Sequence, residues 1–194
     1  PANEIYIKGV RDSGAKTFFS SRWMNGVLVQ CDASLITTLE GLSFVDHVEF
    51  VAPHERLLTT GRRRTDLRTK EVRTASSTQF QLQMFGLDEM HSAGHQGEDV
   101  IIGIFDGGFL GVNTTVPFQH IFDENRMNLT ASRDFVTNSS DVFQYDDHGT
   151  QVFSVIAAYQ DGFYTGGSYE AEYQLYVTED VGSEYRIEEY NWLF

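Results

Sequence analysis

The segment "DVIIGIFDGGF", Asp99 to Phe109, decides the expected fold. Its apolar run over 100–105 is nearly continuous, a pattern typical of a strand buried on both faces of a parallel sheet. Asp106 ends this run, and the two glycines after it allow a sharp turn and close approach of other groups. Since α/β folds place their sites at the carboxyl ends of parallel strands, Asp106 is a candidate site residue. The alternative is that it only caps the following loop.

Strand and helix patterns alternate after residue 97, which indicates an α/β fold with a parallel sheet. "SRDFV" and "YQLYVT" predict short strands, and "SEYRIEEYNWLF" a final helix. "GTQVFSVIAAY" predicts a helix whose apolar face comprises Val152, Val155, Ile156 and Tyr159. Upstream, 78–97 predicts a helix ended by Gly94 or Gly97, with one face formed by Phe80, Met84, Leu87 and Met90.

The first 52 residues predict a small α+β module. "EIYIKGV", "NGVLVQCD" and "FVDHVEFVA" read as strands, and Asp32 can cap a short helix over "ASLITTLEGL". About 50 residues bury only a marginal core, so we expect this module to rest on something larger.

A basic segment separates the two parts. Seven of the chain's 14 Lys and Arg residues lie between Pro53 and Thr74, in a stretch with few large apolar side chains. This composition indicates an exposed linker, the kind of segment that proteases cut.

The bulk composition excludes several classes of protein. A net charge of −14 disfavours binding to nucleic acid, which needs clustered cations. No apolar run is long enough to span a membrane, and the single cysteine, Cys31, excludes an internal disulfide. The opening residues have neither the basic nor the apolar region of a signal peptide.

A second polar cluster stands directly before a predicted helix, in "YDDHGTQVFSVIAA" over 145–158. Asp146 or Asp147 can supply the hydrogen-bond acceptor that a helix start needs, so His148 is not needed as the cap and is available for a role in a site. The positive end of the helix dipole is expected to lower the pKa of His148, so that a neutral imidazole could act as a base.

The ordered pair of "IIGIFDGGF" and "DDHGTQVFSVIAA" resembles the subtilisin-like serine proteases. In that family an aspartate ends an apolar strand, and a histidine later opens a helix as H-G-T-x-V. Gly149, Thr150 and Val152 match the second motif, whereas Gly107 replaces the usual Ser or Thr of the first. "SRWMNGVLV" and "LSFVDHVEFVAP" resemble parts of the family's prodomain.

The resemblance implies an order of domains. Residues 1–52 would be a ferredoxin-like prodomain that chaperones and inhibits the enzyme, and 53–76 the basic processing linker of a zymogen. Residues 77–194 would be the N-terminal part of a subtilisin-like catalytic domain that contacts the prodomain. It further implies a secreted or cell-envelope serine endopeptidase acting on polypeptides, with Asp106 orienting His148 and a serine as nucleophile.

No serine after His148 stands in the family's nucleophile motif. Ser154 falls inside a predicted helix, Ser168 follows two glycines, and Ser183 precedes an acidic helix. The one later asparagine, Asn191, also has a helical context unlike that of an oxyanion donor. We therefore expect this chain to carry only part of the catalytic apparatus and to be inactive alone; the alternative is a homologue that has lost catalysis.

Two alternatives come from other classes of function. Asp106, Asp146, Asp147 and His148 could together hold a divalent metal in a hydrolase. Residues 1–52 could instead act as a protease-inhibitory binding module. No cofactor is expected; calcium is common in the family, but the sequence has no EF-hand-type loop and predicts no site.

Overall fold

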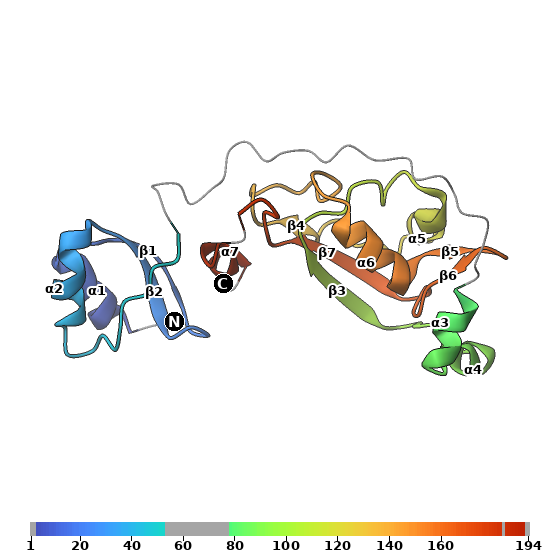
Figure 1. The fold of residues 1–194 in the computed structure, drawn as a ribbon, viewed down its shortest axis with the longest axis horizontal. Helices are drawn as coiled ribbons and strands as arrows, with labels where there is room; N and C mark the ends of the chain where they lie inside the picture. Colours follow the sequence, from blue (N-terminus) through green and yellow to red (C-terminus); the bar gives the residue numbers. More distant parts are fainter. Residues whose placement is uncertain (1–2, 53–77, 184, 193–194) are drawn as a thin grey trace. The chain divides into compact units, whose positions relative to one another are not determined.

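The computed structural model describes residues 3–52, 78–183 and 185–192. The chain forms two compact units, one of residues 1–58 together with 184–194, and the other of residues 59–183. The basic segment that the sequence places at 53–76 lies outside the described residues. Figure 1 shows the elements of both units.

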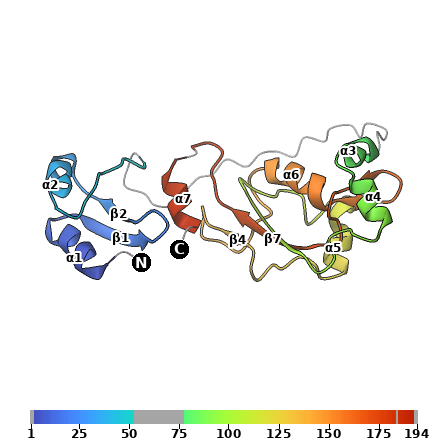
Figure 2. The same cartoon turned by 90° about the horizontal axis from the view of Figure 1, so that it is seen from below.

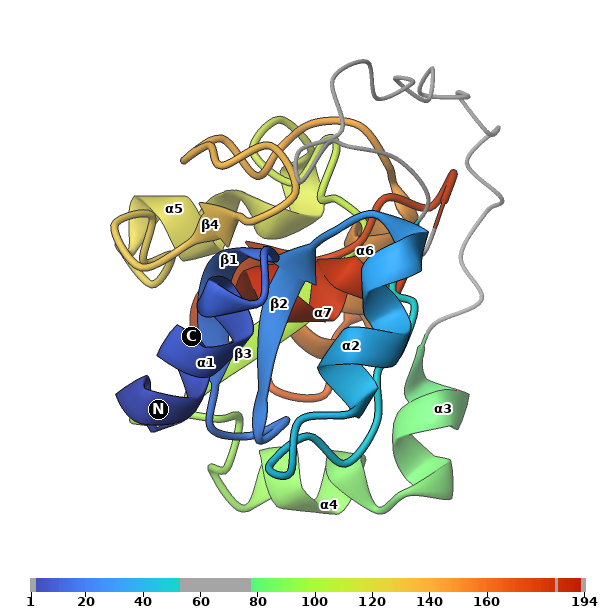
Figure 3. The ribbon, with the colours of Figure 1, turned by 90° about the vertical axis from the view of Figure 1, so that its left-hand side faces the viewer.

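The first unit is built on one β-hairpin. Strands β1 (Lys16–Ser21) and β2 (Gly26–Gln30) pair antiparallel, with an irregularity between Thr17 and Ser20. The helices of the unit are α1 (Glu4–Asp12), the short η1 (Ala33–Leu35), α2 (Ile36–Glu40) and α7 (Ile187–Trp192). Helices α1 and α2 cover one face of the hairpin (Figures 1 and 3), where Val10, Ala15 and Leu39 are buried together.

The prediction of a strand over "EIYIKGV" is wrong, because these residues form α1. The alternation of Ile5 and Ile7 suggested a strand, but Ile7 and Val10 also have helical spacing, and they are the two residues that α1 buries. Ile5 is 74% exposed. The side chain of Asn3 accepts a hydrogen bond from the backbone N–H of Ile5 and caps the helix.

The strand predicted over "FVDHVEFVA" is also wrong, since residues 45–52 have no regular secondary structure. A strand exists only with a neighbour to pair with, and this segment has none among the described residues. Val45 and Val48 instead pack on the small core. The predictions of β2 and of a helix capped by Asp32 are confirmed; the Asp32 carboxylate accepts from the backbone N–H of Ser34 at 2.9 Å.

The helix predicted at the end of the chain is confirmed as α7. Within the first unit, the backbone N–H of Ile187 donates to the carbonyl of Val51 at 3.3 Å. The ring centroids of Phe19 and Tyr190 lie 6.2 Å apart, and Arg186 forms an ion pair with Glu49.

The second unit contains a three-stranded parallel sheet in the order β3-β7-β4. Its strands are β3 (Ile101–Asp106), β4 (Arg133–Asp134) and β7 (Glu172–Val177), and a separate small hairpin joins β5 (Tyr159–Gln160) to β6 (Tyr164–Thr165). The helices are α3 (Gln79–Met84), α4 (Leu87–Ser92), η2 (Val116–Phe118), α5 (Gln119–Asp123) and α6 (His148–Ala157). The expected α/β class with a parallel sheet is confirmed.

Helix α6 runs alongside the sheet (Figures 1 and 2), and both contribute to the core of the unit together with η2, α5 and the connecting loops. The helix is where the sequence predicts it, but the predicted face is only partly right, since Ile156 packs against the core and Val152 is 37% exposed. Val155 is 59% exposed, whereas Gly149, Phe153 and Ala157 are buried. The ring of Phe153 stacks on Phe118 at 5.1 Å between centroids.

Two further expectations about burial are wrong. Strand β3 is not buried on both faces: Ile104 and Asp106 are buried, while Ile101 is 61% and Phe105 51% exposed. The helix expected over 78–97 is broken into α3 and α4 at Gly86, whose φ is +69°. Leu82 faces inward there, whereas the predicted apolar face is exposed at Phe80, Met84 and Met90.

Candidate functional site

Asp106 lies at the carboxyl end of β3, where the parallel ladder with β7 ends at the pair Asp106 and Val177. The residue is 6% exposed, and its carboxylate accepts a hydrogen bond from the backbone N–H of Gly107 at 2.7 Å. Its backbone carbonyl accepts from the N–H of Thr178 at 3.0 Å. The carboxylate is therefore held firmly at the edge of the sheet, as the sequence predicts for its position.

His148 is the first residue of α6. The backbone N–H of His148 donates to the Asp146 carboxylate at 2.7 Å, so Asp146 satisfies one of the free donors of the helix start. Asp147 occupies the N-cap position without a capping hydrogen bond from its side chain. The imidazole ring of His148 is therefore not needed to cap α6 and can contact a residue outside this helix.

That contact is with Asp106. The Nδ1 atom of His148 lies 3.0 Å from each carboxylate oxygen of Asp106. An ionised carboxylate only accepts hydrogen bonds, so Nδ1 carries the proton and donates it. In the neutral ring the lone pair is then on Nε2, and 64% of the His148 side chain is exposed.

The Asp106 carboxylate raises the pKa of His148 above 6.5, first through the hydrogen bond and then through its charge. Asp146 and Glu179 act in the same direction, and burial in the opposite one. The expectation that the helix dipole lowers this pKa is wrong. A full negative charge in direct contact with Nδ1 outweighs the partial positive charge of a helix start.

Two glycines make the approach of helix and strand possible. A Cβ on Gly149 would lie 2.4 Å from the carbonyl oxygen of Gly108 and 2.9 Å from the Cβ of Asp106. A Cβ on Gly108 would lie 2.6 Å from the carbonyl oxygen of Gln144. Side chains at these positions would push α6 away from the end of β3, so the glycines of both motifs are required by close packing.

A second buried carboxylate, Asp134, lies at the same edge of the sheet, because β4 is parallel to β7 and pairs Asp134 with Val177. Its oxygens accept from the backbone N–H groups of Val136 and Thr137 and from the Thr137 hydroxyl at 2.7–2.9 Å. Asp134 thus stabilises its own turn. It is not among the site residues expected from the sequence, where no local signal marks it as buried.

The four residues proposed as metal ligands do not form a common site. Across residues 3–52, 78–183 and 185–192, no group of three or more His, Cys, Asp or Glu side chains is placed to hold a metal ion. Asp146 is engaged at the start of α6 and Asp106 faces the histidine ring. The structure therefore gives the metal-dependent alternative no support.

Each of the three serines after His148 donates a hydrogen bond to a backbone carbonyl, Ser154 through its hydroxyl and the others through the backbone. The hydroxyl of Ser154 donates to the Gln151 carbonyl one turn earlier in α6, at 2.7 Å. The backbone N–H of Ser168 donates to the carbonyl of Ile156, and that of Ser183 to the carbonyl of Asp180. Asn191 lies within α7.

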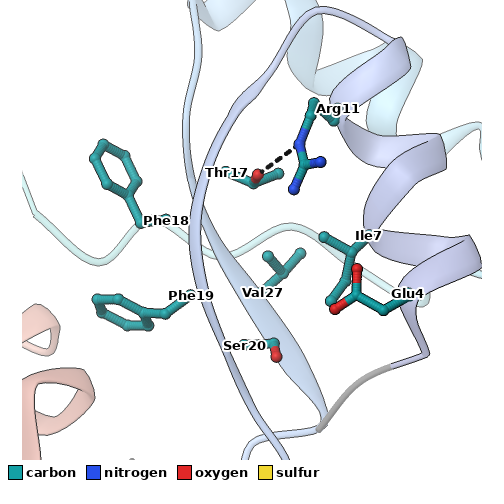
Figure 4. A pocket seen from close by; sticks show the side chains of 8 residues that line it. All are labelled: Glu4, Ile7, Arg11, Thr17, Phe18, Phe19, Ser20 and Val27. Carbon is teal, nitrogen blue, oxygen red and sulfur yellow. Dashed lines mark hydrogen bonds between the residues drawn. The ribbon is translucent and has the colours of Figure 1, made fainter.

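The first unit has a separate surface pocket between α1 and β1 (Figure 4). Glu4, Ile7 and Arg11 of the helix face the strand there, and the Arg11 Nε donates to the Thr17 hydroxyl at 3.1 Å. The pocket shares no residue with the Asp106 and His148 pair.

Residues 1–69 match the family model of the peptidase S8 propeptide domain of Bacteroidota. Peptidase S8 is the subtilisin-like family, so the match supports a subtilisin-like protease propeptide in the N-terminal part of the chain. The matched region does not extend over the residues that carry Asp106 and His148. No curated protein matches the sequence.

Proposed function

We propose that this chain supplies the propeptide and the aspartate–histidine half of the catalytic apparatus of a subtilisin-like serine endopeptidase. The contact of Nδ1 of His148 with both oxygens of Asp106 carries the catalytic part of this proposal. The match of residues 1–69 to a propeptide supports the protease context.

In the proposed mechanism Asp106 keeps the proton on Nδ1 and stabilises the imidazolium that forms during catalysis. The exposed Nε2 accepts a proton from a serine hydroxyl as that hydroxyl attacks a peptide carbonyl, and then donates it to the leaving amine. These steps are the general chemistry of Ser-His-Asp triads, of which subtilisin is itself a standard example. The serine is not one of those after His148 in this chain.

Residues 1–52 are proposed as the propeptide proper, which folds against and blocks the protease, and 53–76 as the segment that is processed. The family match continues to residue 69, so it includes most of the proposed processing segment. We further propose a secreted or cell-envelope location and polypeptide substrates. No helix within the described part of the chain is long and apolar enough to cross a membrane.

A peptide p-nitrophenyl ester tests the catalytic proposal. The 194-residue chain should release no burst of nitrophenol, whereas a chain extended by its downstream coding sequence should show an acyl-enzyme burst. Replacing His148 with alanine in the extended chain should lower the rate by about 10⁴-fold or more. A burst from the 194 residues would contradict the absence of the nucleophile, and an inert extended chain would contradict the protease proposal.

The match to a propeptide favours a second activity of the same chain, inhibition in trans. The 194-residue chain is titrated against a mature subtilisin-like protease from a member of the Bacteroidota, with casein hydrolysis as the readout. Saturable inhibition is expected. Unchanged hydrolysis at micromolar concentrations of the chain would contradict the inhibitory role.

A further inference from the structure

Leu110, in the loop after β3, forms hydrogen bonds to the start of α6 on both sides of His148. The backbone N–H of Leu110 donates to the carbonyl of Asp146 at 2.9 Å. The carbonyl of Leu110 accepts a hydrogen bond from the Thr150 hydroxyl, also at 2.9 Å. Leu110 is thus bonded to the residues two positions before and two positions after His148.

We propose that Thr150 is a positioning residue, which fixes the distance between the Asp106 carboxylate and the His148 ring by anchoring the first turn of α6 to the loop after β3. This inference rests on the proposed function, because it assigns a role toward that pair. Thr150 touches neither reacting atom, so its effect is exerted through the backbone.

The histidine ring needs such an anchor because packing does not hold it. Its side chain is 64% exposed, and Asp106 is its side-chain hydrogen-bond partner. The ring can therefore stay at 3.0 Å only if the two backbones stay in register. Gly149 permits the close approach of α6 to the loop after β3 but provides no attraction between them. The Thr150 hydroxyl provides that attraction through its hydrogen bond to the Leu110 carbonyl.

The hydroxyl of Thr150 has no role in capping the helix. Thr150 is the third residue of α6, and the capping acceptor for His148 is the Asp146 carboxylate. In a helix a threonine hydroxyl commonly bonds to a carbonyl of its own preceding turn. Here it bonds across to the loop that follows Asp106, which is the geometry expected of a tie between two elements.

The test is an NMR titration of the His148 imidazole in the 194-residue chain, assigned by its loss in His148→Gln. Thr150→Val removes the hydroxyl at nearly constant volume. It should lower the titration midpoint toward its ordinary value of about 6.5, by on the order of half a pKa unit. Thr150→Ser keeps the hydroxyl and should keep the midpoint of the unchanged protein.

Thr115→Val is the matched control. The Thr115 hydroxyl also donates to a backbone carbonyl at 2.9 Å, that of Gly111, in the same unit of the chain. Removing it should leave the midpoint of His148 unchanged. If Thr150→Val fails to fold, Thr150→Ala removes the hydroxyl without adding atoms and is read in the same way.

Asp106→Asn separates the two levels of the proposal. If Asp106→Asn lowers the midpoint of His148 while folded Thr150→Val does not, the positioning role of Thr150 is overturned. The contact between Asp106 and His148 is then still supported. If Asp106→Asn leaves the midpoint unchanged, the pair itself is overturned, and with it the proposed function. An equal shift in Thr115→Val would also overturn the positioning role, since the effect would then be nonspecific.

Discussion

Replacing Gly149 with alanine should damage the site through packing alone. The new Cβ would lie 2.4 Å from the Gly108 carbonyl oxygen, and 2.9 Å from both the Asp106 Cβ and the Phe109 ring. Favourable contacts begin at about 3.5 Å, so the first overlap is about 1 Å. Because the obstructing oxygen belongs to the backbone, no side-chain rotation can relieve it.

The expected loss of stability follows from two opposing effects. Overpacking of this kind costs about 3 kcal/mol, at the upper end of its usual range, because backbone must move. Alanine is favoured over glycine in a helix by about 1 kcal/mol. The free energy of unfolding of the second unit should therefore fall by about 2 kcal/mol, roughly a thirtyfold change in the unfolding equilibrium.

Amide hydrogen exchange at Leu175 measures this change, because Leu175 is fully buried and its N–H donates to the Ser132 hydroxyl at 3.0 Å. Gly103→Ala in β3 is the control, since the atoms nearest to its Cβ would be those of the Tyr176 and Phe105 rings, at 3.4 and 3.5 Å. Its exchange rate should change little. An equally small effect of Gly149→Ala would refute the packing argument.

Three further predictions concern capping, core packing and pH. Replacing Asp32 with alanine removes the cap of η1 and should lower the urea midpoint of the first unit, followed through tryptophan fluorescence; an unchanged midpoint would contradict it. Phe153→Ala should cost the second unit about 3–5 kcal/mol, measured by exchange at Leu175, and a loss below about 1 kcal/mol would contradict the assigned core. The raised pKa of His148 predicts that the stabilisation relative to His148→Gln is fully present below about pH 6.5 and declines as pH rises through the folded pKa. A stability difference that grows with rising pH would have the wrong sign.

The position of Asp106 could be predicted from the sequence because its signals are local. An apolar run ended by an aspartate and two glycines defines a strand, its end and the turn after it. The start of α6 at His148 was predictable for a similar reason, since polar residues precede a helical apolar pattern. The contact between the Asp106 and His148 side chains depends on the parallel order of the strands. The α/β pattern of the sequence indicates a parallel sheet but not the order of its strands.

The buried face of α6 could be predicted from hydrophobicity only in part, at Ile156. The larger aliphatic residues Val152 and Val155 remain partly or largely exposed, and the small residues Gly149 and Ala157 face inward beside Phe153. At Gly149 the helix lies so close to the end of β3 that no side chain fits, and this close approach turns Phe153 and Ala157 toward the core. Hydrophobic periodicity depends on the apolar character of the residues and does not show how closely a helix approaches its neighbour.

The errors in the first unit come from short segments whose pattern fits two structures. The cap from Asn3 and the spacing of Ile7 and Val10 select a helix where alternation suggested a strand. The sequence does not predict strand β1, because "KTFFSS" lacks clear alternation and forms a strand through its pairing with β2. Pairing is a non-local property, so residues 44–52 equally could not be assigned from their own sequence.

The tautomer of His148 tests the central claim most directly. Nitrogen-15 chemical shifts of the imidazole, recorded above its pKa, distinguish a proton on Nδ1 from one on Nε2. We expect Nδ1 to be protonated and Nε2 to show the shift of an unprotonated nitrogen, because Asp106 accepts from Nδ1. A neutral ring protonated mainly on Nε2 would contradict the account, since the nitrogen proposed as the base would then have no lone pair to offer.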